Sequence, residues 1–165
     1  MAHLPKNHVL RPFYRILALA AGVYCLIFGI VGIARTSGHS MFAQVPIRAL
    51  GLRTNLAFAI LSVLVGLLVI GATAVGNNVD RNLNMVLGPG FIVMGVVMMT
   101  IMRTSANVLN FGMSTCIVSF LIGLALFAGG LYGEVAPPEQ ALAEEHFRRG
   151  PSHDDQAQRS EPVAP

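Results

Sequence analysis

Four long apolar stretches without a charged side chain constrain this sequence more than any other feature. They cover residues 16–34, 56–76, 85–102 and 111–133. A helix needs about 20 apolar residues to cross a bilayer, and each stretch is close to that length. None of them shows the strict polar–apolar alternation of a membrane β-strand. We therefore expect an all-α integral membrane four-helix bundle, with spans at about residues 13–34, 56–76, 82–102 and 111–133.

The composition supports a membrane protein and argues against nucleic-acid binding. Charged residues make up 12% of the chain and apolar residues 54%, whereas a soluble domain carries about 25% charged residues. The basic residues form no stripe and do not alternate with aromatic residues, so no nucleic-acid partner is expected. Between residues 16 and 133 the charged side chains are Arg35, Arg48, Arg53, Asp80, Arg81 and Arg103.

The two ends of the chain lie outside the expected spans. Residues 1–12 precede the first span, which is longer than the apolar region of a cleaved signal peptide and is expected to be retained. Residues 134–165 contain seven carboxylates, five prolines and few large apolar groups. Such a segment buries too little surface to fold alone, so we expect a polar, largely disordered tail. Residues 138–149 are a candidate short helix within it, with a solvated tail as the favoured alternative.

The distribution of basic residues predicts the orientation in the membrane. With four spans, the N-terminus, the middle connection and the tail lie on one side, and basic residues are more frequent on the cytoplasmic side. That side carries Lys6, Arg11, Arg15, Arg81, Arg148, Arg149 and Arg159, and the other carries Arg35, Arg48, Arg53 and Arg103. We therefore expect a multi-pass protein of the plasma membrane with both termini in the cytoplasm.

Two short strings recur along the chain and suggest an internal repeat. Ser-x-Leu-x-Gly-Leu occupies residues 62–67 and again residues 119–124, 57 positions later. Arg-Thr-Ser occupies residues 35–37 and again residues 103–105, 68 positions later. The pattern indicates two tandem helical hairpins that enter the membrane in the same direction. Chance agreement between short apolar strings is the alternative.

Small residues four positions apart predict close helix packing. Ser62 and Gly66 form one such pair, Ser119 and Gly123 form another, and Gly129 extends the second. A stripe of small side chains lets the backbone of a neighbouring helix approach closely, which supplies the association that apolar lipid tails cannot drive. We expect these residues to pack helices, within the chain rather than between chains.

Charged residues and a proline mark the ends of the spans. Arg15, Arg35 and Arg103 are expected to anchor the helices at the membrane interface, where long basic side chains reach the headgroups. Arg35 and Arg103 would also lie near the unpaired carbonyl groups of helix C-termini. Pro89 falls inside the third span if that span begins near residue 82. It predicts a kink there, or a helix whose regular part begins at Pro89.

The sequence predicts no catalytic, cofactor-binding or metal site. All five histidines lie outside the spans, whereas proton-coupled transporters place ionisable groups at membrane depth. No phosphate-binding loop or hydrolase motif is present. Cys25 and Cys116 lack metal-ligand spacing, and the Met94, Met98 and Met102 ladder is more typical of packing than of Cu(I) binding. The polar clusters at residues 77–82 and 103–110 are typical of caps and turns. We expect no enzymatic activity.

The connection between the first two spans is the candidate surface for a partner. It covers about residues 35–55 and carries His39, Phe42, Gln44 and Arg48. Connections of this length are often functional. A loosely ordered connection is the alternative.

Several strings, taken in order and spacing, resemble a known family. They are GLRTN at 51–55, SVLVGL at 62–67, LNMVLG at 83–88, ANVL at 106–109 and SFLIG at 119–123. Together they are similar to small bacterial four-span membrane proteins, common in actinobacteria, that are grouped as a domain of unknown function. The resemblance runs from about residue 8 to 133. It implies an integral four-helix protein and assigns no activity and no functional residue.

These observations lead to one expected function and one alternative. We expect a structural, accessory or interaction component of the plasma membrane without catalysis. Its partners would be the lipid bilayer and either another membrane protein or further copies of the chain. The alternative is an oligomeric transporter or channel component for a small solute or ion.

Overall fold

The computed structural model describes residues 9–137 and residue 139. The expected N-terminal segment before residue 9 and the candidate helix at residues 138–149 therefore lie largely outside the described residues. The helices and strands are α1 (Arg11–Thr36), β1 (Arg48–Ala49), β2 (Leu52–Arg53), α2 (Leu56–Val75), α3 (Val79–Ile101) and α4 (Met113–Leu131).

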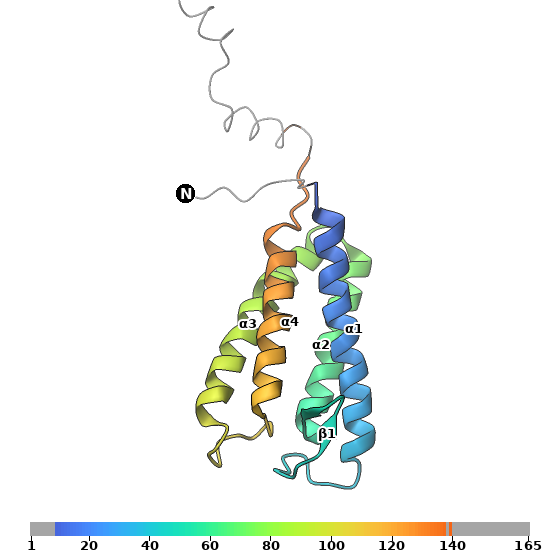
Figure 1. Cartoon of the computed structure of the whole chain (residues 1–165). Coiled ribbons are helices and arrows are strands. Elements are labelled where there is room, and N and C mark those ends of the chain that lie inside the picture. The colour runs from blue at the N-terminus through green and yellow to red at the C-terminus, as the bar shows by residue number, and fades with distance from the viewer. Residues whose placement is uncertain (1–8, 138, 140–165) are drawn as a thin grey trace, which may run out of the picture.

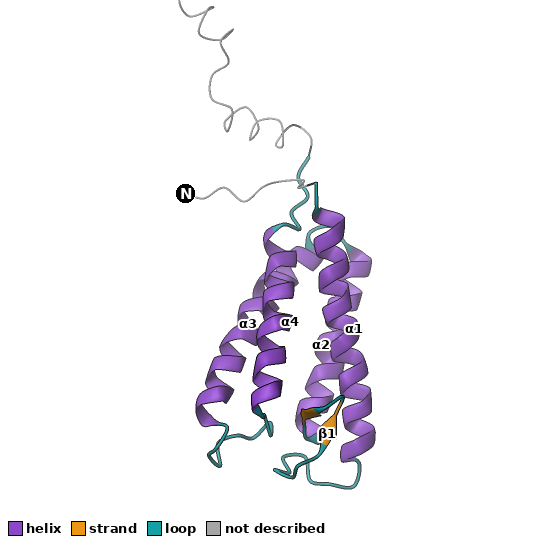
Figure 2. Ribbon diagram, in the orientation of Figure 1, coloured by secondary structure: helices purple, strands orange, loops and turns teal. Residues whose placement is uncertain are grey.

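Four helices in the described part of the chain are long and apolar enough to cross a membrane. The expected all-α four-helix architecture is confirmed. In Figure 1 the start of α1, the α2–α3 turn and the end of α4 lie together, and we call this side the termini end. The α1–α2 and α3–α4 connections, with the small β-hairpin, lie at the opposite side, which we call the loop end (Figure 2).

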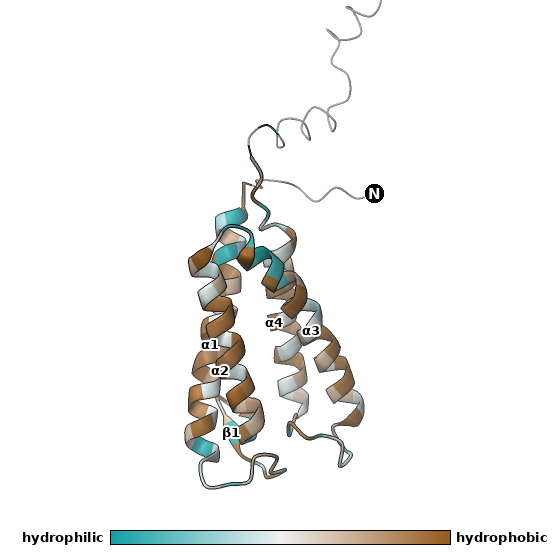
Figure 3. Ribbon diagram, turned by 180° about the vertical axis from the view of Figure 1, so that it is seen from behind, coloured by the Kyte–Doolittle hydropathy of each residue, from teal (hydrophilic) through white to brown (hydrophobic). Residues whose placement is uncertain are grey.

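The bundle consists of two helical hairpins. α1 packs along α2, and α3 packs along α4, while contacts between the two pairs are much sparser. The predicted pairing into two tandem hairpins is confirmed. Viewed from behind, α1, α2 and α3 show mostly apolar residues along their length, α4 is paler, and hydrophilic residues are most frequent at the termini end (Figure 3).

Glycines set the close approach inside the first hairpin. A β-carbon on Gly66 of α2 would lie 2.7 Å from the backbone nitrogen of Leu26 and 2.8 Å from the carbonyl oxygen of Gly22, both on α1. A β-carbon on Gly29 would similarly lie 2.6 Å from the carbonyl oxygen of Ala59. The two backbones therefore approach each other closely where one helix has a glycine, which increases dispersion contact in a lipid environment.

The second hairpin repeats this arrangement. A β-carbon on Gly123 of α4 would lie 2.9 Å from the carbonyl oxygen of Gly88 and 3.0 Å from the backbone nitrogen of Ile92 on α3. Gly95, one turn further on, packs against the ring of Phe120. Gly123 of α4 thus contacts the backbone of α3 in the same way that Gly66 of α2 contacts the backbone of α1.

The helix contacts show which positions of the two hairpins are equivalent. Gly22, Leu26 and Gly29 of α1 correspond to Gly88, Ile92 and Gly95 of α3, each 66 positions later. α2 begins at Leu56 and α4 begins at Met113, 57 positions later. The Arg-Thr-Ser strings, 68 positions apart, lie at helix ends and do not mark equivalent packing positions.

α3 is one continuous helix that contains Pro89 in its interior. The alternative in which the regular helix begins at Pro89 is therefore wrong, because regular structure begins at Val79. Gly88, directly before the proline, packs against the backbone of Phe127 on α4. Packing against a neighbouring helix is the condition under which a membrane helix tolerates an internal proline.

Two buried apolar clusters fill the bundle. The termini-end cluster contains Ala18, Ala21, Val65, Val69 and Leu126. The loop-end cluster contains Phe28, Ala49, Leu52, Phe58, Met98, Phe111 and Cys116. The loop-end cluster takes residues from both hairpins and from the β-hairpin. The termini-end cluster also joins both hairpins, because Leu126 of α4 packs with residues of α1 and α2.

We expect Gly66→Ala to destabilise the protein. The added methyl group would meet backbone atoms of α1, which cannot move away unless the two helices separate. Overpacking of this kind costs about 1–3 kcal/mol. The measurement is the thermal unfolding midpoint of the purified protein in mild detergent, followed by circular dichroism.

Gly71→Ala is the matched control in the same helix, because a β-carbon there meets no atom within 4 Å. This variant should keep or slightly raise the midpoint, since alanine is the better helix former. Equal losses in the two variants would contradict the packing explanation.

Candidate functional site

The connection between α1 and α2 is folded against the bundle. β1 and β2 form an antiparallel ladder in which Arg48 lies opposite Arg53 and Ala49 opposite Leu52. Leu50 and Gly51 form the turn with φ angles of 47° and 83°, as a two-residue type I′ turn requires. Ala49 and Leu52 are buried in the loop-end cluster, so one face of this β-hairpin is part of the core.

Asn110 joins the two connections at the loop end. Its side-chain amide donates to the carbonyl oxygens of Val45, at 2.6 Å, and Thr54, at 2.9 Å. Its side-chain oxygen accepts a 2.8 Å hydrogen bond from the Arg53 guanidinium. The residue is 1% exposed, so each of these bonds is made where water cannot replace it.

Two further amide side chains strengthen this junction. Asn55 caps α2 by accepting from the backbone N–H of Phe58 and also donates to the carbonyl oxygen of Val108 at 2.7 Å. Gln44 donates to the carbonyl oxygens of Ser105 and Asn107. The two hairpins, which touch little along the helices, are thus held together by hydrogen bonds between their connections.

A cavity lined by three arginines opens beside this junction. Its volume is about 350 Å³, and its walls include Arg48, Arg53 and Arg103 together with Phe111 and the first residues of α4. Asp80 is the one carboxylate before Glu134 in the sequence, and it lies at the start of α3, at the termini end. No carboxylate of the described residues therefore neutralises these arginines at the loop end.

An apolar groove lies between α2 and α3. Its volume is about 270 Å³, and its walls include Leu61 and Val65 of α2, Val86 and Met94 of α3, and Phe111 at the loop end. Its surface is almost entirely apolar, apart from Ser62 and Ser119. The groove lies where the two hairpins face each other with few direct contacts.

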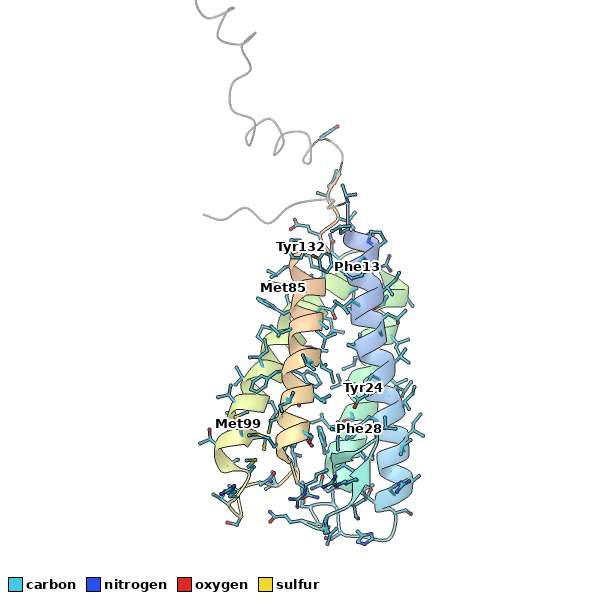
Figure 4. The ribbon with its side chains drawn as sticks, viewed as in Figure 1. Phe13, Tyr24, Phe28, Met85, Met99 and Tyr132 are labelled. Carbon is cyan, nitrogen blue, oxygen red and sulfur yellow. The ribbon has the colours of Figure 1, made fainter. Side chains whose placement is uncertain are left out.

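The termini end holds a second polar cluster. Arg15 of α1 forms a 3.1 Å ion pair with the buried Asp80 of α3 and donates to the carbonyl oxygen of Thr73 at the end of α2. Tyr14 stacks on Tyr132 with ring centroids 4.6 Å apart, and Figure 4 shows Tyr132 beside the first turns of α1. Because Arg15 contacts two neighbouring helices, it ties the hairpins together at this end.

Other polar contacts extend this cluster toward the tail. Arg81 pairs with Glu134 at 3.0 Å, and Asn78 exchanges two hydrogen bonds with the backbone of Val135. Arg11 donates to the carbonyl oxygen of Gly133. These contacts fix the chain that leaves α4 against the starts of α1 and α3.

The residues proposed as a partner loop have different surroundings. His39 and Phe42 are exposed. Gln44 is engaged with the α3–α4 connection, and Arg48 lines the arginine cavity. All four residues are exposed, and Gln44 is held in place by its hydrogen bonds to the α3–α4 connection.

The helix-packing residues lie at helix contacts within the chain. Ser62 is buried and donates to the carbonyl oxygen of Phe58 in its own helix. Ser119 is buried at the groove and beside a small central cavity. Gly66 and Gly123 form the backbone contacts described above, and Gly129 packs against Ala18 of α1, between the hairpins.

The three expected interface anchors differ from one another. Arg15 is engaged inside the bundle through Asp80 and Thr73. Arg35 is exposed in the last turn of α1. Arg103 follows the end of α3, is exposed, and lines the arginine cavity.

The methionine ladder and the cysteines have separate environments. Met94 lines the groove, Met98 is buried in the loop-end cluster with Cys116, and Met102 lines the arginine cavity. Cys25 lines the small central cavity. Across the described part of the chain, no three His, Cys, Asp or Glu side chains gather as metal ligands.

Several buried asparagines and one aspartate have structural roles that were not predicted from the sequence. Asn55, Asn107, Asn110, Asp80 and Asn84 are all buried. Their recurrence at the edges of the apolar stretches was the available signal, because polar side chains there are costly unless they are hydrogen-bonded.

Comparison with known protein families finds one match. A family model described as a domain of unknown function, DUF4383, matches residues 15–132. The chain belongs to the DUF4383 family. The match includes all four helices apart from the first turn of α1. No curated protein and no solved structure matches the chain.

We expect Asn110→Ala to lower the stability of the protein by about 2–4 kcal/mol, because buried hydrogen-bonding groups of Arg53, Val45 and Thr54 lose their partner. The residue also adopts a φ of 55°, which a residue such as alanine rarely adopts. The measurement is the thermal midpoint in mild detergent.

Asn77→Ala is the matched control for the cost of placing alanine at a positive φ angle. Asn77 has a φ of 52° and is exposed in the α2–α3 turn. This variant should carry the conformational cost alone, and its loss should be clearly smaller. Similar losses for both variants would mean that the network around Asn110 contributes nothing measurable.

Proposed function

We propose that this protein is a non-catalytic component of a bacterial plasma membrane that acts by binding, as a structural or accessory protein. Its proposed partners are the bilayer lipids and either another membrane protein or a second copy of the chain. The main support is the way in which hydroxyl groups within the helices are used. Ser62, Thr73 and Thr100 each donate to a carbonyl oxygen four residues earlier in the same helix.

This use of hydroxyl groups favours a binding role over a conducting role. A conduit needs polar groups that face a shared path across the membrane. Here the polar side chains that join different elements are concentrated at the two ends, around Asn110 and around Asp80. The same contacts make the loop end a folded surface, on which Met41, Phe42 and Val108 are exposed.

A transporter or channel component is the second candidate, and one observation favours it. Asp80 and Asn84 are buried on consecutive turns of α3, and one side-chain oxygen of each has no hydrogen-bond partner among the described residues. Buried ionisable groups in membrane helices often mark an ion pathway. The Arg15–Asp80 pair lies at the helix ends, where it also has the structural role described above.

The test of the proposed function combines a flux assay with an intact mass. We expect proteoliposomes containing the protein to leak protons and small ions no faster than empty vesicles. Native mass spectrometry after mild extraction should then show a defined complex with another membrane protein or a homo-oligomer. Ion flux above that of empty vesicles, abolished by Asp80→Asn, would overturn the binding role in favour of the second candidate.

We also propose that both termini lie in the cytoplasm, on the basis of the excess of basic residues at the termini end. This orientation places the exposed His39 outside. His39→Cys should react with a membrane-impermeant thiol reagent added to intact cells. The unsubstituted chain is the control, because Cys25 and Cys116 are buried. Reaction only after the cells are opened would reverse the orientation.

A further inference from the structure

We propose that the arginine cavity at the loop end binds the phosphate of an anionic phospholipid from the adjacent leaflet. This inference deepens the proposed function, because it names a ligand class for a membrane protein that acts by binding. The cavity of about 350 Å³ is large enough for a phosphate group and part of a headgroup, and it is lined by Arg48, Arg53 and Arg103.

No carboxylate of the described residues balances the charges around this cavity. Arg48 and Arg53 lie directly opposite each other on the β-ladder, an arrangement that is destabilising for like charges. Arg103 adds a third positive charge from the end of α3. The nearest carboxylate in the sequence, Asp80, lies at the other end of the bundle and is paired with Arg15. An anion in the cavity would relieve this repulsion.

The start of α4 can provide further hydrogen-bond donors for such an anion. The cavity is also lined by the first residues of α4, where Gly112 at the N-cap makes no side-chain cap. The free N–H groups of a helix N-terminus attract phosphate and add to the effect of the arginines.

The position of the cavity favours a lipid over a dissolved anion. Met113 lines the cavity at the start of α4, and an exposed apolar stripe continues along the same helix through Ile117, Leu121 and Leu124. The stripe spans about 16 Å, close to the roughly 15 Å depth of one leaflet. A phospholipid with its phosphate in the cavity would therefore have a matching apolar surface for an acyl chain.

The experiment measures lipid binding to the full-length protein after lipid removal in mild detergent. Phosphatidylglycerol and phosphatidylcholine are titrated separately, and bound lipid is counted by native mass spectrometry. We expect the wild-type protein to bind phosphatidylglycerol at least tenfold more tightly than phosphatidylcholine. The double variant Arg48→Gln/Arg103→Gln should lose roughly tenfold to thirtyfold in affinity for phosphatidylglycerol. Both arginines are exposed, so the variant should fold, as its thermal midpoint will show.

Arg35→Gln is the matched control, because Arg35 is exposed in the last turn of α1 near the loop end and is not among the residues lining the cavity. It should bind phosphatidylglycerol like the wild type. Equal binding of both lipids, or an equal loss in Arg35→Gln and the double variant, would overturn the proposal. A third arm adds inorganic phosphate. Displacement of the lipid by phosphate at similar concentration would assign the cavity to a dissolved anion and would also overturn it.

The result is independent of the flux assay. Ion flux would overturn the proposed binding role even if the cavity bound phosphatidylglycerol selectively. Loss of lipid selectivity, with no flux, would overturn the lipid site and leave the binding role in place.

Discussion

The whole structure depends on backbone contact between paired helices. Lipid tails are as apolar as the side chains of this bundle, so burying apolar surface gives no driving force for the helices to associate. Close contact replaces that force at Gly66 against Gly22 and at Gly123 against Gly88. Each hairpin is therefore a tightly packed unit, and a single methyl group at either contact is enough to push the helices apart.

The two hairpins are joined to each other by a different kind of interaction. Between them, contact along the helices is sparser than within each hairpin, and polar groups add to the junction at the two ends. Asn110 and Asn55 join the connections at the loop end, and the Arg15–Asp80 pair joins α1 to α3 at the termini end. Because the hydrocarbon core lies between these ends, it contains the apolar groove rather than a polar interface.

The distribution of charge links this architecture to function. At the termini end Arg15 is paired with Asp80, and Arg81 is paired with Glu134. At the loop end three arginines surround a cavity without a carboxylate from the described residues. Among the described residues, arginines are paired with carboxylates at one end of the bundle and not at the other, which suits a protein that binds an anionic partner on one side of the membrane. The lipid site that we propose follows from this asymmetry.

The apolar stretches alone determined the four membrane helices, and recurring small residues indicated the hairpins, because both depend on local spacing that a sequence displays directly. Only the tertiary structure decided which glycines meet, because the contacts of Gly22 and Gly88 depend on the position of the neighbouring helix. It also decided that Arg48, Arg53 and Arg103, which are distant along the chain, share one cavity. Asn110 illustrates the difference: its sequence context indicates a turn, but its burial and its three hydrogen-bond partners arise from contacts between two separate connections.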